Sequence, residues 1–248
     1  MKIVVCVNHV PDTETKVKVG ADNKSIDRAG VNFVINPYDE YAVEEALRLK
    51  EKNGGEVIAL TLGGDSNKET LRKALAMGVD KAVLLKDDAS RDSFSVANAL
   101  AIVVKELSPE VALFGKQSID SDGATVGGMV AELLGWSSVS IVVKLEISGG
   151  EARAEREIEG GHEKVRARLP VVITAQKGLN EPRYPSLKGI MAAKNKPIEE
   201  KQPAPAEIRL ELREMRKPPA KTAGKIVGSG AEAVPELVRL LHEEAKVI

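Results

Sequence analysis

Short apolar runs alternate with segments of helical periodicity along the first 135 positions. The runs predict strands at 2–10, 56–62, 82–85 and 111–114. Between them, apolar residues recur at the spacing of helices that bury one face. Strands that alternate with helices in this way are typical of a parallel sheet covered on both faces, so the pattern predicts an α/β fold.

Residues that start and stop helices set the boundaries of these segments. Asn36-Pro37 predicts a capped helix that ends at Asn53-Gly54, and Ser66 with Glu69 matches a capping box for a helix closed by Gly78. Further helices are expected at 93–107 and from the loop 115–124 to Leu134.

The pattern changes after Trp136. Segments 140–147, 153–159 and 164–169 alternate like antiparallel strands added to the parallel sheet, and 171–174 predicts a buried strand. The prolines and polar residues of 179–196 predict a long exposed loop with at most one helical turn. Prolines between 197 and 219 then mark an extended arm that leads to an amphipathic helix at 235–245.

Composition excludes several classes of function. Lys and Arg total 36 against 37 Asp and Glu, so the net charge of -1 disfavours binding to nucleic acid or to an anionic membrane. One cysteine and three histidines exclude an internal disulfide and argue against a zinc site. No apolar run reaches the ~18 residues of a membrane span, and a strand from Lys2 leaves no room for a signal peptide. We therefore expect a cytoplasmic protein with no membrane insertion.

The site for a ligand is expected beyond the carboxyl ends of the parallel strands, where the strand order reverses. Four loops leave such ends, at 8–13, 36–39, 62–66 and 115–128. The last is rich in glycine and leads into a helix whose free N–H groups favour a phosphate. With 3% aromatic residues, a planar ligand would be held largely by backbone.

Plainer interpretations of the same residues stay open. The loop 115–128 could be only a strand-to-helix connector, and Asp120 with Asp122 could be a divalent-metal pair, although no third carboxylate is near them in the sequence. No Walker motif is present. Cys6 is expected to be an inert core thiol, and His9 and His162 to be solvated.

Residues in the second half of the chain resemble a known family. Ile158-Glu159-Gly160-Gly161-x-Glu163, Leu169-Pro170-x-Val172-x-Thr174 and the run from Leu179-Asn180-Glu181-Pro182-Arg183-Tyr184-Pro185 to Lys194 closely resemble the signature of the electron transfer flavoprotein β subunit. The resemblance extends to Asn36-Pro37-Tyr38 and to Gly115-Lys116-Gln117, and so covers essentially the whole chain.

The resemblance implies a Rossmann-like domain of the adenine nucleotide α-hydrolase type, which joins an α subunit that holds most of the contacts to an FAD. This chain would bind a structural AMP and catalyse nothing alone. Electrons would come from acyl-CoA and related dehydrogenases and leave to a quinone oxidoreductase or another acceptor. By position, the AMP contacts would fall on Cys6, Asn36, Pro37, Tyr38, Asp39, Leu62, Asp120, Ser121, Asp122, Gly123, Ala124, Thr125, Val126, Gly127, Gly128, Met129, Val130 and Ala131.

The resemblance also assigns surfaces for partners. Leu187 would anchor the dehydrogenase, with Tyr184, Ile190 and Met191 in the same signature, and Glu163 would face the α subunit near the flavin. We thus expect a nucleotide-binding domain at 1–216, with a partner-recognition loop at about 179–197. A C-terminal arm and helix at 217–248 would dock on the α subunit.

Departures from the family pattern keep alternatives open. Residues 121–129 differ from the usual members, and the Val126-Gly127 pair is similar to bifurcating relatives, whose β subunit holds a second FAD in place of AMP. Asn180-Glu181-Pro182-Arg183-Tyr184 is instead typical of the single-flavin group.

Two other classes of protein stay open as alternatives. A stand-alone ATP-binding protein of the universal-stress type would end near residue 150, and a purely structural subunit would need no nucleotide.

Overall fold

One mixed sheet organises the chain in the computed structural model, which describes residues 1–221 and 223–248. The strands of this sheet are β1 (Lys2–Cys6), β4 (Glu56–Gly63), β5 (Lys81–Lys86), β6 (Val111–Gly115), β7 (Ser137–Ser148), β8 (Glu151–Ile158), β9 (Gly161–Arg168), β10 (Val171–Ala175) and β11 (Ile198–Lys201). Within the described residues their order is β11-β5-β4-β1-β6-β10-β7-β8-β9. Pairing is parallel from β11 to β7 and antiparallel from β7 to β9, which confirms the predicted fold class.

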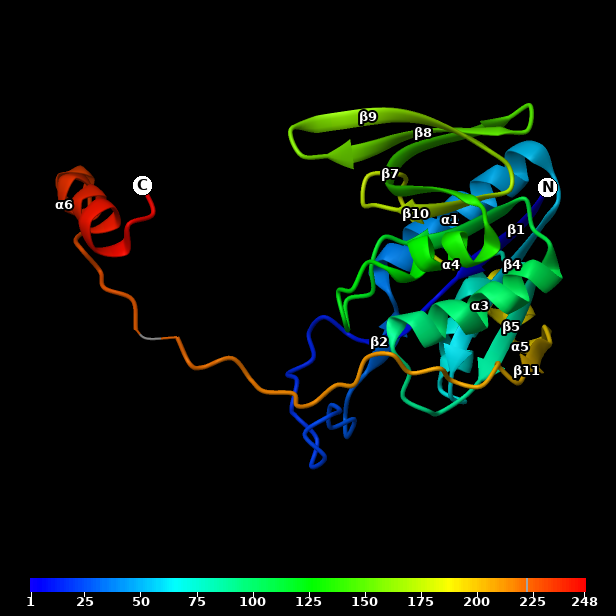
Figure 1. The fold of residues 1–248 in the computed structure, drawn as a ribbon, viewed down its shortest axis with the longest axis horizontal. Coiled ribbons are helices and arrows are strands. Elements are labelled where there is room, and N and C mark those ends of the chain that lie inside the picture. The colour runs from blue at the N-terminus through cyan, green and yellow to red at the C-terminus, as the bar shows by residue number, and fades with distance from the viewer. Residues whose placement is uncertain (222) are drawn as a thin grey trace.

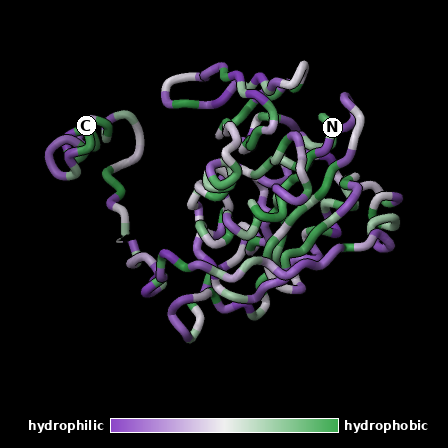
Figure 2. Tube along the Cα trace, turned by 45° about the vertical axis from the view of Figure 1, so that its right-hand side comes forward, coloured by the Kyte–Doolittle hydropathy of each residue, from purple (hydrophilic) through white to green (hydrophobic). Residues whose placement is uncertain are grey.

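Helices cover both faces of the parallel part (Figure 1). They are α1 (Pro37–Asn53), α2 (Asn67–Met77), α3 (Ser93–Leu107), α4 (Val126–Leu134) and α5 (Leu187–Asn195). Successive side chains of a strand point to opposite faces. Ile3 and Val5 accordingly pack with α1 and α2, whereas Val4 and Cys6 pack with α3 and α4. The central strands are therefore largely apolar on both faces, and Figure 2 shows hydrophobic (green) residues concentrated along them in the interior.

Several predicted boundaries are wrong in an informative way. The run 2–10 is two strands, because the chain leaves the sheet after Cys6 and forms β2 (His9–Pro11), which pairs with β3 (Phe33–Ile35) in a separate ribbon. Ser66 does begin α2, but its side chain makes no capping hydrogen bond, so the predicted capping box does not form.

The region predicted as a long loop at 179–196 contains the nine-residue helix α5, and β11 was not predicted at all. α5 lies so close to α2 that a Cβ on Gly189 would stand 2.3 Å from the carbonyl oxygen of Ala76. Arg72 on α2 donates to the carbonyl oxygens of Ala193 and Lys196 at the end of α5. Packing against α2 and the hydrogen bonds from Arg72 thus stabilise a helix that the local sequence does not predict.

The C-terminal residues leave the domain as an extended chain. Figure 1 shows the final helical segment standing away from the sheet, joined to it by the arm. That segment comprises η1 (Ala231–Ala233), α6 (Val234–Arg239) and η2 (Leu240–Ala245), close to the predicted 235–245. Position 222, within the predicted arm, lies outside the described residues.

Candidate functional site at the strand-order reversal

The order of the strands reverses beside β1. The chain runs from β1 outward through β4 and β5, then returns to place β6 on the other side of β1. Loops that leave the carboxyl ends of β1 and β6 therefore diverge, and an open crevice forms between them. This is the position expected from the sequence.

Asp39 joins the two diverging strands from the first turn of α1. Its Oδ2 accepts a hydrogen bond from the Asn8 amide at 2.7 Å, and its Oδ1 accepts one from the Gly115 amide at 2.9 Å. A Cβ on Gly115 would stand 2.4 Å from Asp39 Oδ1, so only glycine permits this approach. Asp39 therefore closes the floor of the crevice and sets the directions of both loops.

The floor is buried deeply enough to shift the pKa of two ionisable groups. Burial raises the pKa of Asp39 to about 7, against the opposing effect of its hydrogen bonds. Burial also raises the pKa of the Cys6 thiol, and the nearby Asp39 carboxylate adds to the effect. Cys6 is a neutral core thiol, as predicted.

The glycine-rich loop after β6 is tied to the floor by two asparagines. Asn36 donates to the Gln117 carbonyl oxygen at 2.8 Å and accepts from the Ile119 amide at 3.3 Å. Asn8 donates to the Ser118 hydroxyl at 2.7 Å. Asp120 to Thr125 remain exposed, so this loop presents its polar groups to the crevice from a fixed base.

A cleft of about 1280 Å³ occupies this place, which is large enough for a nucleotide. Of the residues proposed from the family resemblance, those that line it are Cys6, Asp39, Leu62, Asp120, Ser121, Gly123, Ala124, Thr125, Val126 and Gly127. The lining does not include Asn36, Pro37, Tyr38, Asp122, Gly128, Met129, Val130 or Ala131. Asn36 instead supports the loop, and Val130 and Ala131 lie on the buried face of α4.

The first turn of α4 faces the cleft. Thr125 makes no side-chain capping hydrogen bond, so the amides of this turn are not capped by it. Free amides at a helix start attract anions. Gly127 is needed here for packing, because a Cβ would stand 2.8 Å from Thr174 Cγ2 on β10. The arrangement can hold a phosphate at backbone groups.

Three segments of the lining were not predicted from the sequence. They are residues 22–28 on one rim, 87–93 on the other, and 208–212 of the arm between them. Ile208, Leu210 and Leu212 alternate with charged residues, which is the periodicity of an extended segment with one apolar side. That signal could have separated this segment from the rest of the arm.

The prediction for His9 is also wrong. His9 is buried, its ring stacks on Phe33 with centroids 4.8 Å apart, and its Nδ1 lies 2.9 Å from the Thr70 hydroxyl. Burial lowers the pKa of His9, although Glu69 opposes that effect. Through these contacts, His9 links the β2–β3 ribbon to α2. His162 is exposed on β9, as expected.

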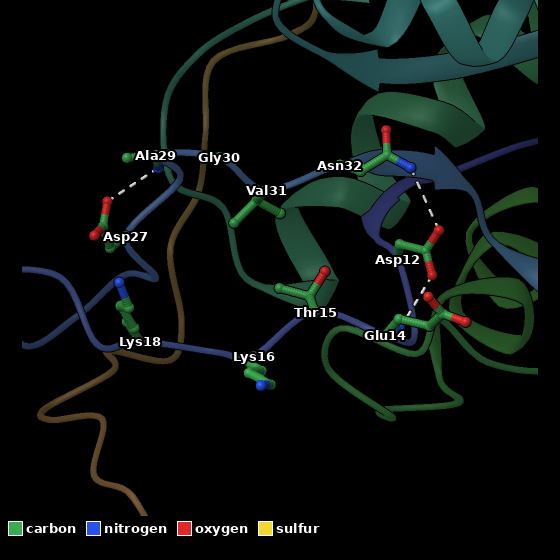
Figure 3. Close-up of a pocket in the computed structure, with 10 residues that line it drawn as sticks. All are labelled: Asp12, Glu14, Thr15, Lys16, Lys18, Asp27, Ala29, Gly30, Val31 and Asn32. Carbon is green, nitrogen blue, oxygen red and sulfur yellow. Dashed lines mark hydrogen bonds between the residues drawn. The ribbon is translucent and has the colours of Figure 1, made fainter.

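A second hollow, of about 470 Å³, lies within the loop that joins β2 to β3 (Figure 3). Its polar groups bond to one another: Asp12 accepts from the Glu14 amide at 3.1 Å and from Asn32 Nδ2 at 3.4 Å, and Asp27 accepts from the Ala29 amide at 3.0 Å. These contacts shape the loop rather than present ligands. Across the described residues no group of three or more His, Cys, Asp and Glu side chains is placed to hold a metal ion.

The predicted partner-binding residues lie on a different surface. Tyr184, Leu187, Ile190 and Met191 are all exposed on or just before α5, with Leu187 82% and Tyr184 95% exposed. Exposed apolar side chains gathered on one element mark an interaction surface. Glu163 is exposed on β9, where it lies 3.4 Å from Arg156.

The segment that leads into α5 is fixed to α1. Arg183 donates to both carboxylate oxygens of Glu44, at 2.8 and 3.1 Å, and to Glu51. Asn180 donates to the buried Glu45 at 2.9 Å. These contacts attach the segment that leads into α5 to α1, although the sequence predicts a loop.

Comparison with known proteins assigns this architecture. The family model of the electron transfer flavoprotein domain matches residues 24–206. The chain is 44% identical to the electron transfer flavoprotein subunit beta of Bacillus subtilis, with all of both chains covered, and 43% identical to that of Syntrophomonas wolfei, with 98% of the relative covered. The chain belongs to the electron transfer flavoprotein β-subunit family. A mitochondrial family member from Oryza sativa is 40% identical, again over the full length of both chains.

Membership in the electron transfer flavoprotein family confirms the resemblance read from the signature residues. Among residues 1–221 and 223–248, no helix is long and apolar enough to cross a membrane.

Proposed function

We propose that this chain pairs with an electron transfer flavoprotein α subunit to form a heterodimer that shuttles electrons. The heterodimer accepts electrons from acyl-CoA and related dehydrogenases and passes them to a quinone oxidoreductase or another acceptor in the cytoplasm. The observation that carries the proposal is the full-length similarity, at 44% identity, to a relative named as an electron transfer flavoprotein subunit beta. The chain alone catalyses no reaction in this account.

The cleft at the strand-order reversal is proposed to hold one AMP in a structural role. Its polar groups suit such a ligand, because the start of α4 offers amides for a phosphate. Asp120, exposed at the mouth, offers carboxylate oxygens for ribose hydroxyls. Bound AMP would contact both the loop after β1 and the glycine-rich loop after β6. It would thereby stabilise the folded positions of these two loops.

An FAD held mainly by the α subunit is proposed at the interface between the subunits. The flavin supplies the redox chemistry, and the protein supplies orientation and electrostatics. In this chain, Glu163 is the residue proposed to face the α subunit near the flavin. Its exposure on the β8–β9 ribbon, which Figure 1 shows projecting along one side of the domain, leaves it accessible to a partner.

The exposed residues of α5 are proposed as the dock for dehydrogenases. A carrier that serves several donors needs contacts that are specific yet short-lived. Leu187, with Tyr184, Ile190 and Met191 around it, offers one apolar anchor on a helix fixed to α2. Most of the binding energy of such a dock comes from a few central residues.

The arm at 217–248 is proposed to dock on the α subunit. Val234, Leu237 and Val238 of its terminal helix are exposed. Exposed apolar residues of this kind on an amphipathic helix are explained when a partner covers them.

Reconstitution tests the proposal as a whole. The chain is co-expressed with the α subunit from the same source, and the complex is supplied with an acyl-CoA dehydrogenase, its substrate and an artificial terminal acceptor. We expect a 1:1 complex that contains FAD and that couples substrate oxidation to reduction of the acceptor. A complex that carries FAD but accepts no electrons from dehydrogenases would contradict the proposed donors.

A further inference from the structure

We propose that residues 208–212 of the arm form the outer wall of the adenine-nucleotide site and contact the ligand's base. This inference rests on the proposed nucleotide site at the strand-order reversal. It adds binding residues from a part of the chain about eighty positions beyond the glycine-rich loop.

The segment presents an apolar face to the cleft. Ile208, Leu210 and Leu212 all line it; of the two charged residues between them, Glu211 also belongs to the lining and Arg209 does not. The three apolar side chains remain 49%, 75% and 50% exposed. Three neighbouring apolar side chains that face an open cleft and stay uncovered imply an apolar surface that completes the contact.

One end of the segment is fixed to the loop between β5 and α3. Asp92 caps α3 by accepting from the Ser95 amide at 2.8 Å through Oδ1. Its other oxygen, Oδ2, accepts from the amides of Arg209 and Leu210 at 2.7 and 2.8 Å. The Arg209 guanidinium also lies over the Phe94 ring, 3.5 Å from its centroid.

Contacts on both sides extend this attachment. Arg91, on the same loop, donates to the Ala204 carbonyl oxygen at 2.8 Å. On the opposite rim, Lys24 pairs with Glu211 at 3.1 Å and the Met215 amide donates to the Asn23 carbonyl oxygen at 2.7 Å. Residues 204–215 therefore cross the cleft from one rim to the other as a strap.

The chemistry of the strap fits a nucleoside base better than a phosphate. Asp92 already accepts the amides of Arg209 and Leu210, so these two N–H groups are not free to bind a phosphate, and Leu210 offers the cleft its apolar side chain. The polar loop after β6 and the start of α4 lie among the other lining residues. A ligand with a planar base and a phosphate matches this division, with a flat face of the base against Leu210 and the phosphate towards α4.

The test measures how fast labelled AMP leaves the purified heterodimer, with native sequence and with three single variants. Leu210→Ala shortens the apolar wall at a position exposed enough that folding is little affected. Asp92→Asn keeps an equally good cap for α3 but replaces an acceptor of the strap amides. Arg213→Ala is the matched control, because Arg213 lies on the strap outside the cleft lining.

We expect Leu210→Ala and Asp92→Asn to raise the dissociation rate of AMP about tenfold or more, and Arg213→Ala to leave it within twofold. Thermal melting of the heterodimer stripped of AMP checks that neither variant acts through global unfolding. If native heterodimer retains AMP and all three variants release it at the native rate, the strap is not part of the site. If the native heterodimer binds no AMP at all, the proposed nucleotide site itself fails, and the inference fails with it.

Discussion

Replacing Arg183 with alanine tests whether α5 is held in place by the contact between residues 180–183 and α1. The buried Glu44 accepts from Arg183 Nε and Nη2, and from Arg48 Nε at 2.7 Å. Burial by itself raises the pKa of Glu44, but the hydrogen bonds from Arg183 and Arg48 outweigh it and leave that pKa below its usual value. Without Arg183 the ionised Glu44 keeps one cationic partner.

The expected cost follows from these contacts. A hydrogen bond to a charged group contributes about 1.5–3 kcal/mol. Arg48 remains, and solvent reaches about a third of the Arg183 side chain, so we expect a net loss of about 2 kcal/mol rather than the sum of the bonds. For a chain of this size, that corresponds to a melting temperature lower by about 4–8 °C.

Thermal melting and hydrogen exchange on the same variants decide the question. Arg183→Ala is expected to expose the amides of α5 to faster exchange, and Arg183→Lys to behave almost as badly, because an ammonium cannot make the paired contact with Glu44. Glu51→Gln is the control, since Glu51 is largely exposed and its ion pair contributes under about 1 kcal/mol. Unchanged melting and unchanged exchange across α5 in Arg183→Ala would refute the reasoning.

Four further outcomes are expected. When the heterodimer is the limiting component, Leu187→Ala should lower dehydrogenase-linked turnover about thirtyfold. The melting temperature should not change, because the side chain is exposed. Turnover equal to that of the native protein would refute the role of Leu187 as an anchor. Because the pKa of Asp39 is about 7 when folded and about 4 when unfolded, the folded chain binds an extra proton between those values, and stability falls as pH rises through that window. Urea unfolding at pH 5 and 8 should show about 2–3 kcal/mol of this loss in native protein but not in Asp39→Asn, because about two pH units of the window lie above pH 5 and each contributes about 1.4 kcal/mol. Gly127→Ala should cost about 1–3 kcal/mol in urea unfolding through its clash with β10, whereas Gly128→Ala, with open space around its Cβ, should cost nothing. Truncation after Lys217 should weaken heterodimer assembly in titration, and unchanged affinity would show that the arm belongs to this chain alone.

The parallel half of the fold could be predicted because its signals are local. Asn36-Pro37 begins α1, Gly78 ends α2, and α3 occupies the expected 93–107. The alternation of strands and helices indicates a parallel sheet and so a ligand site at the carboxyl ends of its strands, and the strand order of the structure places the crevice at β1 and β6. Each of the helix boundaries depends on residues within a few positions of it.

The parts that could not be predicted depend on distant contacts. α5 forms in a segment rich in proline and polar residues because Arg72 and the backbone of α2 support it from more than a hundred positions away. His9 is expected to be solvated from its local sequence, but it is buried by contacts with Phe33 and Thr70, which lie far from it in the chain. In the same way, the outer wall of the cleft comes from the arm, and its attachment to Asp92 has no counterpart in local sequence.

The nucleotide content of the heterodimer tests the central claim most directly. The purified complex is denatured, the protein is removed, and the released nucleotides are separated by chromatography and quantified against protein. We predict one FAD and one AMP per heterodimer. Two FAD with no AMP would contradict this prediction and would place the chain among the bifurcating relatives, to which its Val126-Gly127 pair is similar.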